Sequence, residues 1–162
     1  MMSSVDVIPV LHNVFSPQKV VEAARITYGL GYKMFVVTKA SGSAAQAGVP
    51  EAQKLAIKLG RSFACLPDLP DALEVLRPSR VLLIVPKKFG KEPLLKEAMD
   101  AEGRMLVVFG GAEPGLSRRE LEMGMPVFVD GVEGDIGSLG LVAISLYLLK
   151  RELAAHKPPQ QL

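Results

Sequence analysis

Two glycine-rich segments near the C-terminal end have the residue types best suited to binding a ligand through the main chain. The apolar stretch 105–109 runs into Gly-Gly-Ala-Glu-Pro-Gly at 110–115, and the apolar stretch 126–129 runs into a second glycine segment at 130–137. Glycine accepts positive φ and lets a ligand approach the backbone closely. Because ligands of open α/β sheets bind beyond the carboxyl ends of the strands, the two segments predict one pocket.

The first segment alone does not decide between a ligand loop and an ordinary strand-to-helix turn. It lacks the Gly-Lys-Ser/Thr of a P-loop and does not fit Gly-x-Gly-x-x-Gly, so neither kind of phosphate binding is indicated. The functional alternative is a loop whose N–H and C=O groups recognise a nucleoside-like ligand.

Few side chains outside these segments suggest chemistry. Arg25 lies between Ala24 and Ile26 on an expected helix, where an arginine can also simply extend from a half-buried face. His12 is expected just after the first strand and His156 in a polar tail, and neither has metal-ligand company in sequence, so a metal hydrolase is not predicted. Cys65 lies in an apolar stretch and is expected to be a buried core thiol.

Several enzyme classes lack their sequence signatures here. The chain contains no Gly-x-Ser-x-Gly and no Asp/Glu-x-Lys tripeptide, which counts against a serine hydrolase and against a nuclease of the restriction-endonuclease type. The formal charge of +2 is small for a dedicated nucleic-acid-binding domain, although a local patch could still hold RNA.

Apolar strand-like stretches alternate with amphipathic helix-like stretches along the chain. Strands are expected at 5–11, 33–38, 63–66, 80–86, 105–109 and 126–129, and helices at 16–30, 50–60, 68–76, 91–101 and 138–153. The segment 40–48 is expected to be a flexible loop. This alternation predicts a single-domain α/β protein with a parallel sheet flanked by helices, spanning residues 1–154, followed by a polar tail at 155–162.

Composition favours a soluble cytoplasmic protein. Hydrophobic residues make up 49% and charged residues 22% of the 162 residues, and the single cysteine allows no internal disulfide. We expect no signal peptide, and no apolar run approaches the roughly 20 residues that span a bilayer.

The last expected helix, 138–153, has apolar residues all round its axis. A helix of this kind must be covered on every side. The sheet can cover only one side, so the sequence predicts a homodimer that buries this C-terminal helix.

Three motifs together resemble one family. They are Lys19-Val-Val-Glu-Ala-Ala-Arg25-Ile-Thr-Tyr-Gly-Leu-Gly31, the segment Leu106 to Ser117 containing both Gly110-Gly-Ala-Glu-Pro-Gly115 and Leu-Ser, and Ser138-Leu-Gly-Leu-Val-Ala143. In this order and spacing they resemble the SPOUT class of S-adenosylmethionine-dependent RNA methyltransferases, whose fold is an α/β knot. The resemblance extends to about residue 153.

The resemblance implies a C-terminal trefoil knot, an RNA substrate (rRNA or tRNA) and S-adenosylmethionine as cofactor. No metal is expected, because neither histidine has metal-ligand company. The resemblance also implies Arg25 as the catalytic residue that orients the acceptor. The implied cofactor-binding residues are Gly110, Gly111, Glu113, Gly115, Val129, Asp130, Gly131, Ser138 and Leu139.

Four positions depart from the family pattern, namely Lys19, Ala112, Gly140 and Val142. They leave open a catalytically silent binding or regulatory module that keeps the fold and the dimer. A second alternative is an unknotted α/β domain that binds another nucleotide.

Overall fold

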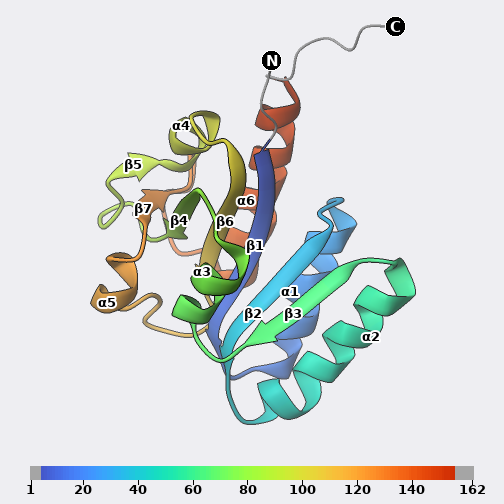
Figure 1. Ribbon diagram of the computed structural model, residues 1–162. Helices are drawn as coiled ribbons and strands as arrows, with labels where there is room; N and C mark the ends of the chain where they lie inside the picture. The colour runs from blue at the N-terminus through green and yellow to red at the C-terminus, as the bar shows by residue number, and fades with distance from the viewer. Residues whose placement is uncertain (1–4, 156–162) are drawn as a thin grey trace, which may run out of the picture.

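The computed structural model describes residues 5–155, and these form one parallel sheet with helices on both faces (Figure 1). The sheet has seven strands in the order β3-β2-β1-β6-β4-β7-β5, and every neighbouring pair is parallel. The strands are β1 (Val5–Val14), β2 (Met34–Ala40), β3 (Ser62–Leu66), β4 (Arg80–Ile84), β5 (Glu92–Pro93), β6 (Gly103–Gly110) and β7 (Met125–Phe128). The predicted fold class, a single-domain parallel sheet flanked by helices, is confirmed.

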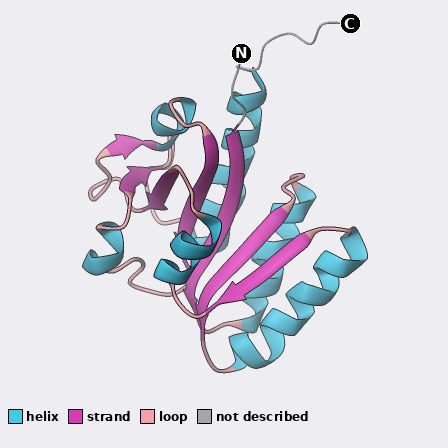
Figure 2. Cartoon of the chain, in the orientation of Figure 1, coloured by secondary structure: helices cyan, strands magenta, loops and turns pink. Residues whose placement is uncertain are grey.

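Six α-helices and one π-helix accompany the strands within residues 5–155, and the last helix follows the last strand (Figure 2). These helices are α1 (Pro17–Gly29), η1 (Ala44–Gly48), α2 (Val49–Leu59), α3 (Leu69–Leu76), α4 (Leu94–Met99), α5 (Arg118–Leu121) and α6 (Gly137–Ala155). None of these helices has the length and hydropathy needed to cross a bilayer.

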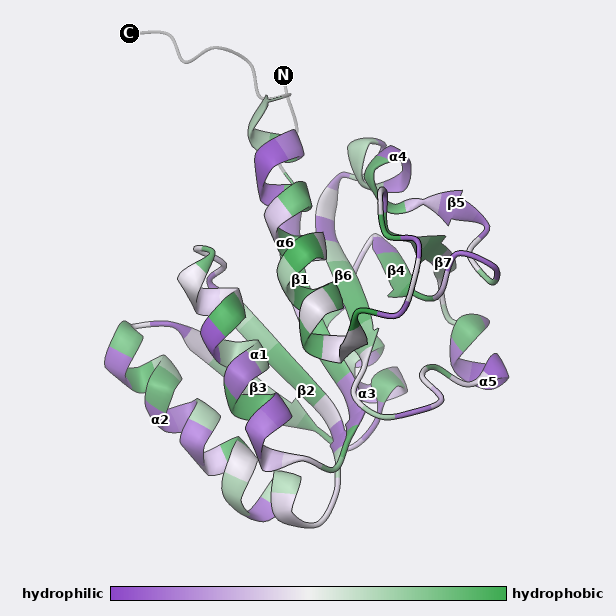
Figure 3. Ribbon diagram, turned by 180° about the vertical axis from the view of Figure 1, so that it is seen from behind, coloured by the Kyte–Doolittle hydropathy of each residue, from purple (hydrophilic) through white to green (hydrophobic). Residues whose placement is uncertain are grey.

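Alternating residues of the central strands face two separate cores. Val7 and Leu11 of β1 pack in the larger core with α1, α2, α4 and α6, whereas Ile8 and Val10 pack in the smaller core beneath α3. Figure 3, viewed from behind, shows α1, α2 and α6 along the face opposite α3. Residues buried on both faces explain the continuous apolar runs in the sequence.

The alternation breaks at the carboxyl ends of β1 and β2. Asn13 has φ 63° and Lys39 has φ 54°, a region that non-glycine residues seldom adopt. Beyond these residues Val14 packs in the larger core, so His12 and Thr38 are the last side chains of their strands on the α3 side. Strained backbone of this kind is frequent at functional sites.

Several local expectations are wrong. Part of the segment 40–48, expected to be a loop, forms the π-helix η1, and the helix expected at 91–101 is reduced to α4 by the short strand β5. Cys65 is exposed rather than buried, because β3 is the edge strand of the sheet. His12 lies within β1 rather than after it, and His156 lies outside the described residues.

The last helix is apolar all round but is not equally buried. Leu146 and Leu149 are fully buried against the sheet, and the Tyr32 hydroxyl donates a hydrogen bond to the Leu146 carbonyl at 2.6 Å. Burial raises the pKa of Tyr32, so this hydroxyl keeps its proton. Ile144 and Tyr147, in contrast, are 38% and 49% exposed.

Candidate metal centre

His12 is the centre of a polar cluster at the carboxyl edge of the sheet. Its side chain is fully buried, although it lies at the end of a central strand. Strand pairing places it opposite Thr38 of β2 on one side and Gly110 of β6 on the other. A buried imidazole needs partners for both ring nitrogens, and here it has them.

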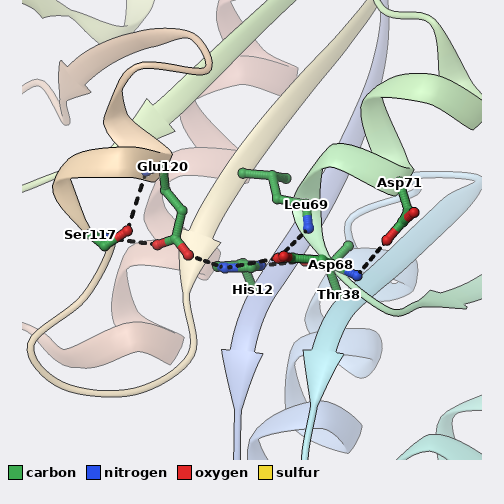
Figure 4. Close-up of polar contacts among 7 residues, drawn as sticks. All are labelled: His12, Thr38, Asp68, Leu69, Asp71, Ser117 and Glu120. Atoms are coloured by element: carbon green, nitrogen blue, oxygen red, sulfur yellow. Dashed lines mark hydrogen bonds and ion pairs between the residues drawn. The ribbon is translucent and has the colours of Figure 1, made fainter.

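The two ring nitrogens of His12 have different partners (Figure 4). Nδ1 lies 2.8 Å from the Thr38 hydroxyl oxygen, and Nε2 lies 2.6 Å from Oε2 of Glu120. A carboxylate oxygen of Asp68 is 4.0 Å from Nε2. Each of the three ionisable residues offers one ligand atom, and these atoms all lie within 4.8 Å of one another.

The two carboxylates reach His12 from the first turns of two short helices. Asp68 is the N-cap of α3, where it accepts a hydrogen bond from the Leu69 N–H at 2.8 Å and forms a capping box with Asp71. Glu120 and Ser117 form the capping box of α5, with Oε1 of Glu120 accepting from the Ser117 N–H at 2.7 Å. Capping therefore explains the two acids locally, but it does not explain a buried histidine between them.

The environment of Glu120 favours its ionised form. Burial acts to raise the pKa of Glu120, but hydrogen bonds from Ser117 and His12 outweigh it, so the pKa is lowered. The opposite side of the cluster is neutral, since Thr38 contributes only a hydroxyl. The site thus combines an imidazole nitrogen with carboxylate oxygens, which is a donor set used by Mn²⁺, Fe²⁺ and Zn²⁺.

The surroundings of His12 fit a metal ligand. Ligating histidines usually donate their second N–H to a neighbouring oxygen, and the Thr38 hydroxyl is placed to accept it from Nδ1. Two ligand atoms each about 2.1 Å from one ion at right angles lie about 3.0 Å apart. The separation of 2.6 Å between Nε2 and Oε2 would therefore have to open slightly on metal binding.

The structure brings part of the predicted glycine-loop pocket together beside this cluster. The Gly111 N–H donates to the His12 carbonyl at 2.7 Å, and the Ser138 hydroxyl donates to the Gly110 carbonyl at 3.0 Å. Leu139 follows in the first turn of α6. Lys19, from the start of α1, donates to the Gly111 carbonyl at 3.2 Å.

Other predicted residues have different surroundings. Asp130 accepts a hydrogen bond from the Leu95 N–H at 3.1 Å, so its carboxylate is directed to α4, while Val129 is buried. Glu113 is exposed, and Gly115 and Gly131 have φ +101° and +84°. These positive φ values explain the two glycines without any ligand.

Gly111 also has a structural explanation. A Cβ atom there would lie 2.8 Å from Cβ of Val14 and 2.9 Å from the Asn13 carbonyl oxygen. A side chain at this position would therefore collide with β1 rather than enter open space. Loss of binding in a Gly111 variant would not by itself identify a ligand site.

Arg25 is separated from the cluster by the sheet. Its guanidinium is 63% exposed and pairs with Glu22 at 3.0 Å, and its side chain lines a groove between α1 and α2. These helices pack on the face opposite His12. No contact among the described residues joins Arg25 to the glycine loops.

Comparison with known proteins identifies close relatives over nearly the whole chain. The family described as "RecB-family nuclease (DUF2122)" matches residues 42–148. The chain belongs to this family. A "putative type II restriction enzyme" of Aeropyrum pernix is 48% identical over 147 residues, covering 91% of this chain and 94% of the relative. A second protein with that description, from Methanocaldococcus jannaschii, is 42% identical. The match covers 88% of this chain and 95% of the relative.

Solved structures show a different kind of similarity. A probable methyltransferase from Bordetella pertussis superposes with a TM-score of 0.72 at 18% identity, covering 91% of this chain and 96% of the other. The SpoU methyltransferase AviRb from Streptomyces viridochromogenes, in complex with AdoMet, superposes with a TM-score of 0.73 at 13% identity. The match covers 96% of this chain and 63% of the other. At these identities the likeness establishes a shared fold alone.

These comparisons correct the predicted function. The relatives that share 42–48% of their residues with this chain are named as restriction enzymes, and the family description is that of a nuclease. The prediction of an S-adenosylmethionine-dependent RNA methyltransferase is contradicted by this family, as are the alternative functions of a silent module and of a domain that binds another nucleotide. The SPOUT resemblance is supported at the level of the fold.

The residues of the candidate metal centre are far apart in the sequence. His12 lacks metal-ligand company along the sequence but has Asp68 and Glu120 beside it in space. The signals for both acids were present, since Ser117 and Glu120 have the spacing of a capping box and Asp68 precedes Pro70. What the sequence lacked was any sign that the two helix starts meet at His12.

Proposed function

We propose that this protein is a divalent-metal-dependent phosphodiesterase that cleaves nucleic acid, with His12, Asp68 and Glu120 as the metal-binding residues. The observation that supports it most directly is the convergence of these three side chains, from β1, α3 and α5, within 4.8 Å. The family description and the names of the relatives supply the reaction class and make DNA the first substrate to test.

The proposal also accounts for a missing motif. The chain has no Asp/Glu-x-Lys tripeptide, so the metal ligands would have to come from elsewhere. Among residues 5–155, the His12 cluster is the one group of three or more histidine, cysteine or acidic side chains close enough to share an ion.

The residues of the cluster would have distinct roles. A bound cation would supply Lewis-acid stabilisation of the phosphoryl oxygens and acidify a coordinated water. Thr38 would hold the His12 ring so that Nε2 presents its lone pair. Glu120 would remain fixed through Oε1 to the Ser117 N–H while Oε2 turns to the metal. Asp68 would move the short distance needed to complete the set.

The test is cleavage of plasmid and linear duplex DNA by purified protein with Mn²⁺, Mg²⁺ or Zn²⁺, against a chelated control. The wild-type protein should cleave DNA with at least one of the metals. The cleavage rates of His12→Ala and Glu120→Gln should be at least 100-fold lower. Glu122→Gln is the matched control, because it removes an exposed acid two residues from Glu120 and leaves every proposed ligand and its cap in place. Failure of the wild type in all metals on DNA and RNA would refute the proposal.

A nucleoside ligand at the glycine loops is a separate proposal that concerns binding alone. It covers the residues predicted above from Gly110 to Leu139, and S-adenosylmethionine is its first candidate, since AviRb of the same fold was solved with AdoMet. The Ser138–Gly110 hydrogen bond, which joins two of the loops, supports it. Calorimetric titration with S-adenosylmethionine tests it independently of cleavage.

We also propose two features of the structure. Two copies of the chain associate through α6. The C-terminal third of the chain is threaded as a knot. The support for association is an apolar hollow of about 570 Å³ along α1 and α6. It is lined by Ile26, Gly29, Leu30, Ile136, Gly140, Ala143, Ile144 and Tyr147. The support for the knot is the likeness to SpoU structures, with TM-scores up to 0.73.

A further inference from the structure

A polar groove separates α1 from α2 on the sheet face opposite His12. Figure 3 shows the two helices side by side, with hydrophilic segments along both. The groove encloses about 220 Å³ and is lined by Val21, Arg25, Glu51, Lys54, Leu55 and Lys58. Three of the four charged side chains in this lining are cationic.

The two lysines of the groove have no anionic partner in the described part of the chain. Neither Lys54 nor Lys58 forms an ion pair or a side-chain hydrogen bond within residues 5–155. They are four residues apart on α2, so they face the same side and repel one another. A bound anion would relieve this repulsion.

The acidic residues nearby have other roles. Glu51 lies in the first turn of α2, where a carboxylate is favoured by the helix dipole. Glu22 pairs with Arg25 at 3.0 Å, but the guanidinium remains 63% exposed and retains free N–H groups. The groove therefore keeps an excess of cationic donors directed to solvent.

The groove begins at the same edge of the sheet as the His12 cluster. α1 starts at Pro17, only three residues after β1 ends at Val14. Gly48, which precedes α2, lies so close to Pro17 that a Cβ atom on it would be 2.8 Å from the Pro17 Cα. At 1.5 Å per residue, Val21 and Arg25 lie about 6 and 12 Å from the start of α1. Each strand of duplex DNA carries one phosphate per about 3.4 Å of helix axis, so a strand crossing this edge would bring several phosphates over the groove.

We infer that the α1–α2 groove is a second binding site, where Arg25, Lys54 and Lys58 contact backbone phosphates of duplex DNA. The inference rests on the proposed function for its ligand, but the groove and the metal centre share no residue. It gives this domain a way to hold a long substrate on the face opposite the metal centre. It also gives Arg25 a role in binding rather than in chemistry.

The test is the salt dependence of binding of a fluorescent 30-base-pair duplex, measured by anisotropy in a chelator so that no cleavage occurs. The Lys54→Glu/Lys58→Glu variant should bind at least tenfold more weakly at 100 mM salt. Its slope of log K against log salt should be shallower by about two, since two phosphate contacts are lost. The matched control is Lys88→Glu/Lys91→Glu, which makes the same charge change at exposed positions near β5 and should stay within threefold of wild type.

Three outcomes separate this inference from the proposed function. His12→Ala should bind DNA with the wild-type slope, because it leaves the groove intact. Loss of affinity in the Lys54/Lys58 variant together with no cleavage by the wild type supports the groove and refutes the metal-dependent nuclease. Equal slopes for the Lys54/Lys58 variant and its control, or equal competition by tripolyphosphate and by unlabelled duplex, would overturn the groove as a DNA site.

Discussion

At the scale of single residues, the proposed metal binding at the carboxyl edge of the sheet depends on His12. It is fully buried, and both of its ring nitrogens are engaged, one by a neutral hydroxyl and the other by an acid. Without a metal, a proton must lie between Nε2 and Oε2 of Glu120 for the 2.6 Å contact to be favourable. The proposed metal would take the place of that proton, which the neutral ring would then carry on Nδ1 and donate to the Thr38 hydroxyl.

Thr38→Val tests whether the partner of Nδ1 orients His12 as a ligand. The substitution keeps the volume but leaves Nδ1 without its 2.8 Å partner. Metal affinity should fall by about 10- to 100-fold. The free energy of unfolding should fall by only about 1 kcal/mol. Calorimetric titration and chemical denaturation measure the two effects, and an unchanged affinity would show that Thr38 plays no part in the site.

Glu120 should make the stability depend on pH in a defined direction. Its pKa is lowered in the folded protein relative to an ordinary value of about 4.3. Its contribution is therefore fully present above about pH 4.3 and is lost as the pH falls through the lowered pKa. Denaturation midpoints from pH 7 to 3 should fall more steeply for wild type than for Glu120→Gln. Parallel curves would show that the Glu120 interactions do not favour the ionised form.

At the scale of elements, the site depends on helix starts that serve two purposes. Asp68 caps α3 and Glu120 belongs to the capping box of α5, and each also approaches His12. Capping fixes where the carboxylates lie, so little further ordering would be needed when a metal binds. The short helices α3 and α5 therefore matter more to the site than their length suggests.

Asp68→Asn and Asp68→Ala separate the two purposes of this residue. Asparagine is as good an N-cap as aspartate, so Asp68→Asn should change the free energy of unfolding by less than about 0.5 kcal/mol. It should still weaken metal binding, because the charge is lost. Asp68→Ala should lose about 1 kcal/mol of stability as well. If Asp68→Asn binds metal like wild type, Asp68 is a cap only.

The elements themselves were largely predictable from the sequence. Continuous apolar runs identified β4 and β6 because these strands are covered on both faces. The sequence prediction is wrong where the burial of a residue depends on the position of its strand in the sheet rather than on the local sequence pattern. Cys65 is exposed because β3 is an edge strand, and strand order is not encoded in any single segment.

At the scale of the whole molecule, the site itself could not be predicted. His12 and Glu120 are 108 residues apart and meet only because β6, the strand preceding α5, pairs with β1. The strained residues Asn13 and Lys39, which end the two strands beside His12, leave no clear signal in the sequence. A motif search along the chain finds neighbours in sequence, whereas this cluster is assembled by strand order.

The apolar surface of α6 allows a test of assembly. Ile144 and Tyr147 are exposed in the single chain, whereas Leu146 is fully buried. Ile144→Glu should therefore give a folded monomer, and Leu146→Glu should unfold the protein because it buries a charge. Light scattering and circular dichroism distinguish the two. A monomeric wild type at 50 μM would contradict association through α6.

The protein has a fold that is also found in methyltransferase structures, but it belongs to a family described as nucleases. A fold does not determine a function, so the chemistry of the site must decide. The central claim is that His12, Asp68 and Glu120 bind a metal ion.

The most direct measurement is calorimetric titration of the metal-free protein with Mn²⁺ and Zn²⁺. We predict one site per chain with a dissociation constant of about 10 μM or lower. His12→Ala should abolish this site, whereas Glu122→Gln, which removes an exposed acid two residues from Glu120, should leave it unchanged. Absence of saturable binding by the wild type, or equal binding by wild type and His12→Ala, would contradict the account.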